Sequence, residues 1–368
     1  MDVVHYFPKG YADGRGKFLE ACSSLLDHAP ITLDSISHPL SGPDGEALAT
    51  DIAVIGNPAA KRVLLLNTAT HGTEGACGSG CMIGWLRSVG YAELPTNVRV
   101  VLVHAINPHG YAYVRRVTED NVDLNRNFLD HDQPYPENPG YTGIHDDLIP
   151  AKWVGPEREA ADQRLVAYAD AQGAPALQAA ISGGQYTHPD GLFFGGNAPT
   201  WSNLTFRDIL RTIVAPAETV GFIDYHTGLG PYGTAELISG FPVDSPEFGR
   251  LVEWYGNGLA SSAPGGASTS SSLSGCIDAA IPQELPDAEA VVVTAEYGTY
   301  SVKRVIDALR GDTWLANNRD GVDPELAAAI KAEVRQALYP DERDWKELVY
   351  LRSRQLIRRA IQALAEKV

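Results

Sequence analysis

Cysteine is scarce in this sequence, and long hydrophobic runs are missing. Only four cysteines occur in 368 residues, and no two have CxxC spacing, which argues against a disulfide framework and against a thiolate zinc site. No window approaches the roughly 18 consecutive apolar residues of a membrane span, and the N-terminus lacks the charged-then-apolar pattern of a secretory signal. These absences predict a soluble protein of a reducing compartment, the cytoplasm.

Basic residues are also in short supply. The chain carries 29 Lys and Arg against 46 Asp and Glu, a formal net charge of −17. Binding to nucleic-acid phosphates depends on clustered basic residues, so we expect no nucleic-acid partner, and nothing in the sequence indicates a membrane partner. The motif G-x-S-x-G is absent as well, which disfavours a serine hydrolase.

Apolar runs and helical patterns alternate along the chain. Branched and apolar residues predict four buried strands, over 63–69, 98–105, 220–225 and 290–295. Between these runs, helices are predicted over 75–89, 157–171, 205–214 and 247–260. This alternation is typical of a layered α/β fold.

The ends of the chain extend this pattern. Residues 31–55, interrupted by the turn SGPDGE, predict an edge hairpin ahead of the main sheet. Residues 301–368 are predicted to be mostly helical, ending in a long helix whose apolar positions are Trp345, Leu348, Val349, Leu356, Ala360 and Leu364. Residues 129–156 and 263–275 are predicted to be loops. No linker or repeat is visible, so we predict one domain over 1–368.

Polar residues follow three of the four apolar runs directly. The first run leads to His71 and Glu74 in THGTEG, the third to His226 in GFIDYHTGLG, and the fourth to Glu296 in VVVTAEYGTY. In open α/β sheets, ligands bind at the carboxyl ends of the strands. Two imidazoles and one carboxylate can hold a catalytic zinc and leave one position open for water. His71, Glu74 and His226 supply that set.

Each of these residues also has an ordinary structural interpretation. His226 alone could be a hydrogen-bonded core histidine, Asn125 and Arg126 could form a surface turn, and Glu296 could cap a helix that starts near Ser301. Together, however, they place charged and polar groups at the ends of apolar strands, which a protein core rarely tolerates without a compensating ion. The joint pattern therefore favours a zinc site.

The order of these motifs resembles a known family. HxxE after a strand, DLNR about fifty residues later, a distant DxH and a late strand-end Glu are similar to the zinc carboxypeptidase superfamily. Within this superfamily the sequence resembles the metallocarboxypeptidases and the related aspartoacylase and succinylglutamate-desuccinylase branch. The nearest match is a bacterial group of uncharacterised substrate. It covers 63–299 and implies a three-layer α/β/α fold with a mixed central β-sheet, holding one zinc ion per chain.

The resemblance also implies roles for individual residues. His71, Glu74 and His226 match the zinc ligands, and Glu296 matches the carboxylate that activates the zinc-bound water as general base and protonates the leaving nitrogen. The remaining matches lie in RRVTEDNVDLNR. Asn125 and Arg126 match the pair that binds a substrate carboxylate, and Asp123 matches the aspartate that orients the first zinc histidine. One of Arg115 and Arg116 matches the arginine that polarises the carbonyl; Arg116 is favoured for this role, and Arg115 is then expected to bind substrate.

The sequence departs from the family in ways that bear on the substrate. Peptide-cleaving members carry a loop tyrosine before the catalytic glutamate, whereas no tyrosine occurs here between Tyr255 and Tyr297. The ending EYGT is closer to the deacylase branch. We therefore expect hydrolysis of an amide bond in a small carboxylate-bearing substrate, an N-acyl amino acid or short peptide.

Two other interpretations stay open. The chain could be a metallocarboxypeptidase that removes C-terminal residues from peptides, or a catalytically inactive relative that binds a ligand. The glycine-rich segment 183–196 (GGQYTHPDGLFFGG) is compatible with a loop that contacts substrate and with a structural turn between helices.

Overall fold

A mixed β-sheet forms the centre of the computed structural model, which describes residues 2–88, 91–92, 94–270 and 272–366. In that part of the chain the sheet has eight strands in the order β1-β2-β4-β3-β5-β8-β6-β7. Their bounds are β1 Ile31–Ser41, β2 Ala47–Gly56, β3 Arg62–Asn67, β4 Val98–His104, β5 Thr219–Thr227, β6 Ala235–Ser239, β7 Leu259–Ser261 and β8 Glu289–Tyr297. The four predicted strands are thus confirmed as β3, β4, β5 and β8, and the edge hairpin as β1 and β2.

The strand directions explain the buried runs. Strands β4, β3, β5 and β8 are parallel neighbours, whereas β1 pairs antiparallel with β2, β2 with β4, and β6 with β8. Parallel strands are covered on both faces, so their sequences are apolar throughout rather than alternating. In β3, Leu64 and Leu66 belong to the hydrophobic core on one face of the sheet, and Val63 and Leu65 to the core on the other.

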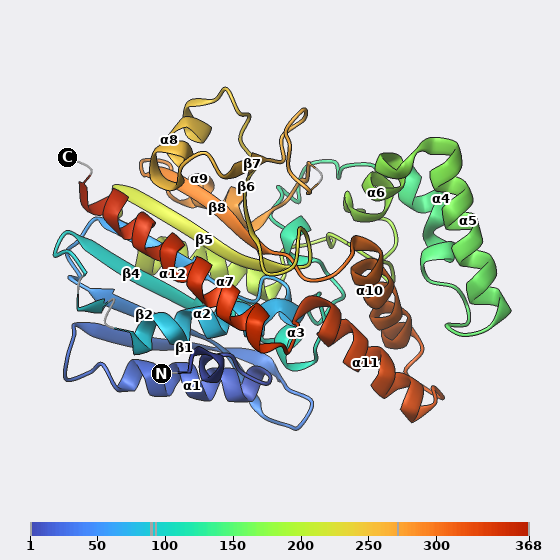
Figure 1. The fold of residues 1–368 in the computed structure, drawn as a ribbon, viewed down its shortest axis with the longest axis horizontal. Helices are drawn as coiled ribbons and strands as arrows, with labels where there is room; N and C mark the ends of the chain where they lie inside the picture. The colour runs from blue at the N-terminus through green and yellow to red at the C-terminus, as the bar shows by residue number, and fades with distance from the viewer. Residues whose placement is uncertain (1, 89–90, 93, 271, 367–368) are drawn as a thin grey trace.

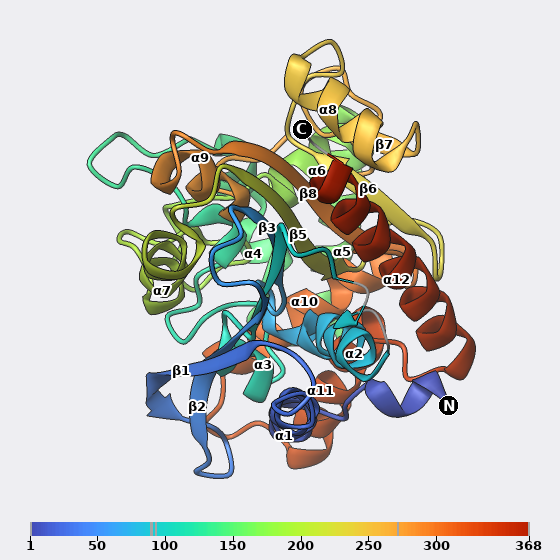
Figure 2. The same cartoon turned by 90° about the vertical axis from the view of Figure 1, so that its left-hand side faces the viewer.

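Helices cover both faces, which confirms the predicted three-layer α/β/α arrangement (Figure 2). On one face lie α1 (Tyr11–Ser23), α2 (Gly75–Arg87), α8 (Pro246–Tyr255) and α12 (Arg343–Glu366). On the other lie α7 (Trp201–Ile209), continued by a π-helical turn over Leu210–Val214, and α9 (Ala280–Glu284). The sheet therefore contributes to two separate hydrophobic cores.

A further group of helices stands at one end of the sheet, on the right in Figure 1. It consists of α4 (Pro139–Leu148), α5 (Pro156–Gln172), α6 (Ala174–Ser182), α10 (Val302–Asn317) and α11 (Pro324–Leu338). These helices share a third core, in which Tyr141, Leu148 and Leu338 are fully buried. The group faces the carboxyl ends of the parallel strands, where the sequence places its candidate site.

Two predicted segments have a different structure from the one expected. The predicted loop 129–156 contains α4, because Asn138 caps the helix through the Tyr141 amide, Pro139 occupies the first turn, and Tyr141, Ile144 and Leu148 form a buried stripe. The predicted helix 247–260 ends at Tyr255, where Gly256 has a φ of 81°, and β7 follows.

The predicted helix 75–89 is α2, which ends at Arg87; position 89 lies outside the described residues. The C-terminal helical segment is confirmed as α10, α11 and α12, and positions 367 and 368 are likewise outside the described range. Of the apolar positions predicted for the last helix, only Leu348 is exposed, at 40%. The assignment of 1–368 to a single domain stays a prediction.

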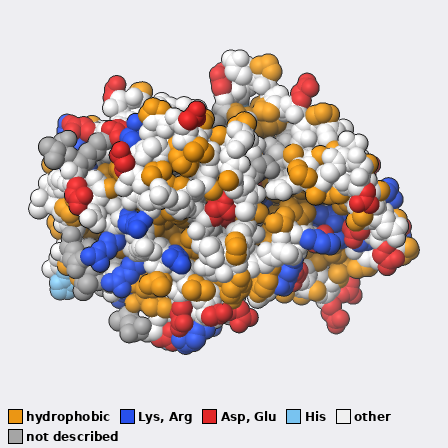
Figure 3. Space-filling model, turned by 45° about the horizontal axis from the view of Figure 1, so that its top comes forward, with side chains coloured by type: hydrophobic (Ala, Val, Ile, Leu, Met, Phe, Trp, Pro, Cys, Tyr) orange, Lys and Arg blue, Asp and Glu red, His pale blue; other side chains and the backbone are white. Residues whose placement is uncertain are grey.

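All four cysteines are free, and Cys22, Cys77 and Cys81 are buried. Acidic side chains are scattered over the face shown in Figure 3 and do not gather in one patch there. None of the helices within the described ranges is both long enough and apolar enough to cross a membrane.

Candidate metal centre and active site

The turn after β3 brings His71 and Glu74 into the same site. A short 3-10 turn, Gly72–Glu74, connects the end of β3 to α2. Position 72 has no room for a side chain, because a Cβ there would lie 1.9 Å from the backbone carbon of Gly110. The amides of Gly72 and Thr73 donate to the carbonyls of Arg116 and Arg115, at 3.2 and 3.0 Å. The glycine thus allows a close backbone contact that fixes both side chains.

The neighbouring strands supply the other groups. On β5, Asp224 and His226 are two residues apart and so point to the same face of the sheet. On β8, Glu296 is the register partner of His226. The carboxyl ends of β3, β5 and β8 therefore meet at one site, as expected for an open parallel sheet.

Three side chains converge there with their metal-binding atoms together. The Nδ1 of His71 lies 3.0 Å from Glu74 Oε1, and the Nδ1 of His226 lies 3.2 Å from Glu74 Oε2 and 3.0 Å from the Nδ1 of His71. The candidate ligand atoms of the three residues all lie within 4.8 Å of one another, and all three residues are buried. Two imidazole nitrogens and a carboxylate are the donor set of a catalytic zinc site, so these residues fit that ion.

The outer nitrogens of both histidines are held by buried carboxylates. Asp123 Oδ1 lies 3.1 Å from His71 Nε2, and Asp224 Oδ2 lies 2.6 Å from His226 Nε2. A carboxylate at Nε2 keeps the proton there and leaves the Nδ1 lone pair free to bind a metal. The sequence analysis assigned no role to Asp224, although the D-x-H spacing on a strand already places it beside His226.

The charges of this cluster suit a cation. Burial opposes the ionisation of Glu74, but His71 and His226 lower its pKa below the usual range of a glutamate. Burial acts in the same way on Asp123, and there Arg116 and Arg126 bring the pKa well below its ordinary value. Both carboxylates are therefore ionised at neutral pH.

The two adjacent arginines have different surroundings. Arg116 lines the cavity and donates from Nε to Asp123 Oδ2 at 2.9 Å and from a terminal nitrogen to Glu74 Oε1 at 3.2 Å. Arg115 turns away from the cavity: it donates to Asp312 at 3.2 Å and to Asn121 at 2.8 Å. These contacts are consistent with the role predicted for Arg116. They do not agree with the substrate-binding role predicted for Arg115, because its guanidinium is used in packing against α10.

Arg126 is a buried guanidinium without a carboxylate partner in the described part of the chain. Its terminal nitrogens donate to the carbonyls of Asn125 and Ser182, at 3.0 and 2.7 Å, and its Nε has no partner among the described residues. The neighbouring Asn125 also lines the cavity, and its Oδ1 accepts from the Ile277 amide at 2.8 Å. A guanidinium with this arrangement is well suited to bind an incoming carboxylate.

The glycine-rich segment 183–196 supports these arginines. The ring of Phe193 lies under both guanidinium groups, with its centroid 5.1 Å from Arg116 Cζ and 5.5 Å from Arg126 Cζ. The hydroxyl of Tyr186 donates to the Arg126 carbonyl at 2.7 Å. At Gly184, where φ is 91°, a Cβ would lie 2.8 Å from Arg126 Cδ. The segment therefore holds Arg126 and Arg116 in position, a role that its sequence did not reveal.

Glu296 faces the same cavity. One of its carboxylate oxygens accepts from the Leu229 amide at 3.0 Å, and the residue is 7% exposed. Burial, assisted by the negative charge of Glu74, raises the pKa of Glu296 to about 8. A carboxyl group with a raised pKa can both take up and release a proton near neutral pH.

A cavity of about 690 Å³ connects all of these groups. Its wall includes the three candidate ligands, Arg116, Asn125, Arg126 and Glu296. The sequence analysis gave no role to Cys276 and Asp278, which line the cavity as well; burial, assisted by Asp224, raises the pKa of Asp278 to about 6. Cys276 directly follows the predicted loop 263–275, and Asp278 lies two residues further on.

The family of the chain follows from its match to a family model. A family model described as "Protein of unknown function (DUF2817)" matches residues 7–352. The chain belongs to the DUF2817 family. All the predicted site residues of this DUF2817 protein lie within the matched range. No curated protein was found to match its sequence.

Several solved structures resemble this DUF2817 protein at low identity. Thrombin activatable fibrinolysis inhibitor shows 12% identity and a TM-score of 0.47, covering 93% of this chain and 77% of its own. A metallo-carboxypeptidase from Burkholderia cenocepacia shows 14% identity and a TM-score of 0.40, with coverages of 92% and 68%. A succinylglutamate desuccinylase/aspartoacylase from Rhodobacter sphaeroides shows 15% identity and a TM-score of 0.38, with 79% of this chain covered.

The DUF2817 chain spans 65% of the Rhodobacter sphaeroides protein, just under two thirds of its length. These proteins are of the kinds that the sequence motifs resemble. Likeness at these scores says nothing of the reaction, so the function of this DUF2817 protein rests on its own residues.

Proposed function

We propose that the protein is a zinc-dependent hydrolase that cleaves an amide bond in a small substrate with a free carboxylate, an N-acyl amino acid in the first instance. The observation that carries the proposal is the convergence of the Nδ1 atoms of His71 and His226 on the carboxylate of Glu74, with Asp123 and Asp224 on the outer nitrogens. Such an arrangement is expected of a metal site whose ligands are oriented by outer carboxylates, and it supports the proposal.

The bound ion would lower the pKa of water towards neutrality and polarise the substrate carbonyl. Glu296 would take one proton from the attacking water and pass it to the leaving nitrogen. The C–N bond breaks and a C–O bond forms, so one water is consumed and a carboxylic acid and an amine are released. Glu296 is suited to both transfers because its carboxylate lies in the same cavity wall as the three candidate ligands, with the Leu229 amide holding one of its oxygens.

Two arginines would interact with the negatively charged groups of the substrate. Arg116, beside Glu74, would stabilise the negative charge that develops on the carbonyl oxygen, because a guanidinium keeps its own charge throughout the reaction. Arg126 and Asn125 would bind the free carboxylate. Among the described residues Arg126 has no carboxylate partner, which supports this assignment.

The test is a hydrolysis screen of N-acyl amino acids, dipeptides and C-terminally blocked peptides, each with and without a metal chelator. We expect cleavage of N-acyl amino acids that the chelator abolishes and added zinc restores. Cleavage of peptides from their free C-terminus instead would indicate a metallocarboxypeptidase. Turnover that is insensitive to the chelator would contradict the proposed chemistry.

A further inference from the structure

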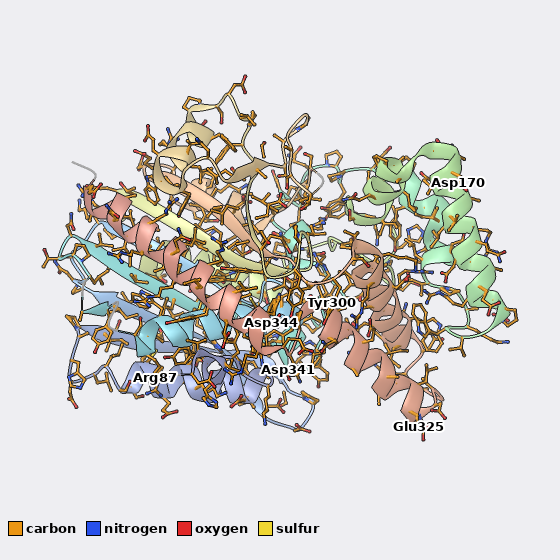
Figure 4. All side chains as sticks on the ribbon, in the orientation of Figure 1. Arg87, Asp170, Tyr300, Glu325, Asp341 and Asp344 are labelled. Carbon is orange, nitrogen blue, oxygen red and sulfur yellow. The ribbon has the colours of Figure 1, made fainter. Side chains whose placement is uncertain are left out.

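The cavity extends well beyond the polar site into the group of helices at the end of the sheet. Figure 4 shows this group, with Asp170 near the C-terminal end of α5 and Tyr300 between the sheet and the start of α10. Apolar side chains from three of these helices line the cavity, among them Leu165, Val166, Ala169, Leu177, Val305 and Ile306. We call this part of the cavity the helical channel.

The helical channel begins directly beside the candidate metal centre. A Cβ placed on Gly228 would lie 3.1 Å from Leu338 Cδ2 and 3.6 Å from Val305 Cγ1, so these apolar side chains contact the backbone two residues after His226. The next residue, Leu229, donates its amide to Glu296. A substrate carbonyl near Glu296 would therefore direct one of its two substituents along this apolar wall.

The charged groups of the helical channel are already paired with one another. Arg310 on α10 contacts Asp162 of α5 at 2.9 Å and Asp307 at 2.8 Å, and Lys303 also contacts Asp307. These ion pairs bridge α5 and α10, and Arg158 of α5 also contacts both carboxylates, Asp162 at 2.8 Å and Asp307 at 3.2 Å. The charged groups of α5 and α10 thus contact one another, whereas the channel wall described above is apolar, which suits an uncharged chain.

Apolar side chains remain exposed along the channel. Val166 is 59% exposed and Val302 is 43% exposed, and both line the cavity. An elongated apolar ligand would cover such surface, and each methylene group that it buries contributes about fourfold in affinity, equivalent to about 0.8 kcal/mol.

We propose that the helical channel binds a linear aliphatic chain, so that the substrate is an amino acid carrying a medium- or long-chain acyl group. This inference rests on the proposed function and specifies its substrate class. Arg126 would bind the amino-acid carboxylate, and the acyl chain would run from the carbonyl beside Glu296 between α5 and α10. Hydrolysis would release a fatty acid and an amino acid.

The experiment compares N-acyl glycines and N-acyl leucines with acetyl, butyryl, octanoyl and dodecanoyl chains. For each compound we would measure kcat/KM with the zinc-loaded wild-type protein and binding to Glu296→Gln by calorimetry. The kcat/KM and the affinity should both rise with chain length, by up to about fourfold per methylene. Calorimetry on a variant with little turnover measures binding in the channel independently of the reaction.

Two variants on α5 form a matched pair. Ala169→Phe places a ring in the channel and should lower the dodecanoyl-to-acetyl ratio of kcat/KM by about tenfold, since roughly two methylenes would lose their contacts. Ala167→Phe makes the same change at an exposed position of the helix outside the cavity wall and should leave the ratio unchanged.

The outcomes separate the channel from the proposed function. Affinity that rises with chain length without any turnover would support the channel and contradict the proposed hydrolysis. Turnover and affinity that are flat or fall with chain length would overturn the channel while the hydrolase stands. Absence of both binding and turnover across the series would overturn both.

Discussion

Asp224→Asn tests whether the carboxylate behind His226 prepares that histidine for a metal. Asp224 is buried, and it accepts from Asn67 Nδ2 at 2.8 Å and from Thr70 Oγ1 at 2.9 Å in addition to its contact with His226. An asparagine has the same shape but presents one oxygen and one amino group. If its oxygen faces His226 Nε2, its amino group meets the amide hydrogens of Asn67; if it is reversed, it forces the proton of His226 onto Nδ1.

Either orientation of the new amide weakens the site, and neither carries the negative charge that polarises the imidazole. Loss of such an outer partner costs about ten- to hundredfold in metal affinity. This corresponds to about 1.4–2.7 kcal/mol of binding free energy. The 2.6 Å contact and complete burial of the pair favour the upper part of this range.

The assay is a competition titration of zinc against a chromophoric chelator, with Asp244→Asn as control, because this exposed residue changes the net charge equally. Thermal unfolding of the metal-free proteins would show that both variants are folded under the assay conditions. An Asp224→Asn variant that binds zinc as tightly as the wild type would refute the role assigned to Asp224.

Three further perturbations have defined outcomes. Glu296→Gln should retain zinc and lower kcat by about a hundredfold to ten-thousandfold, and near-normal turnover would show that another group is the base. Arg126→Ala should raise KM for a substrate with a free carboxylate by about ten- to hundredfold but not for its methyl ester; equal effects on acid and ester would exclude carboxylate binding. Burial lowers the pKa of His104 from an ordinary 6.5 to about 4. Between these pH values His104 is therefore protonated in the unfolded chain and neutral in the folded protein. The free energy of unfolding should therefore fall as the pH is lowered from 6.5 to 4, by up to about 3 kcal/mol. Urea unfolding of His104→Asn should show a smaller fall over the same pH range. The same fall in wild type and variant would contradict the role assigned to His104.

Patterns confined to single strands predicted much of the fold and brought together the residues of the candidate metal centre. Runs of branched residues marked β3, β4, β5 and β8, because parallel strands are buried on both faces and must be apolar throughout. His71, Glu74 and His226 were identifiable because polar residues at the ends of such strands meet at one edge of the sheet.

Features that depend on contacts between distant segments could not be predicted in this way. Arg115 and Arg116 are adjacent in sequence, and only the position of Asp312 on α10 shows which of them turns away from the cavity. The support that Phe193 gives to Arg116 and Arg126 depends on the path of a glycine-rich segment without any regular period. The helical channel likewise depends on how α5, α6 and α10 lie relative to one another, which no pattern within a single helix predicts.

Zinc content of the purified protein tests the central claim most directly. Measured by elemental analysis after incubation with zinc and removal of unbound ion, it should be about one zinc per chain for the wild type and close to none for a folded His71→Ala variant. A folded wild-type protein that retains no zinc would contradict the account, because the convergence of His71, Glu74 and His226 would then serve the structure alone.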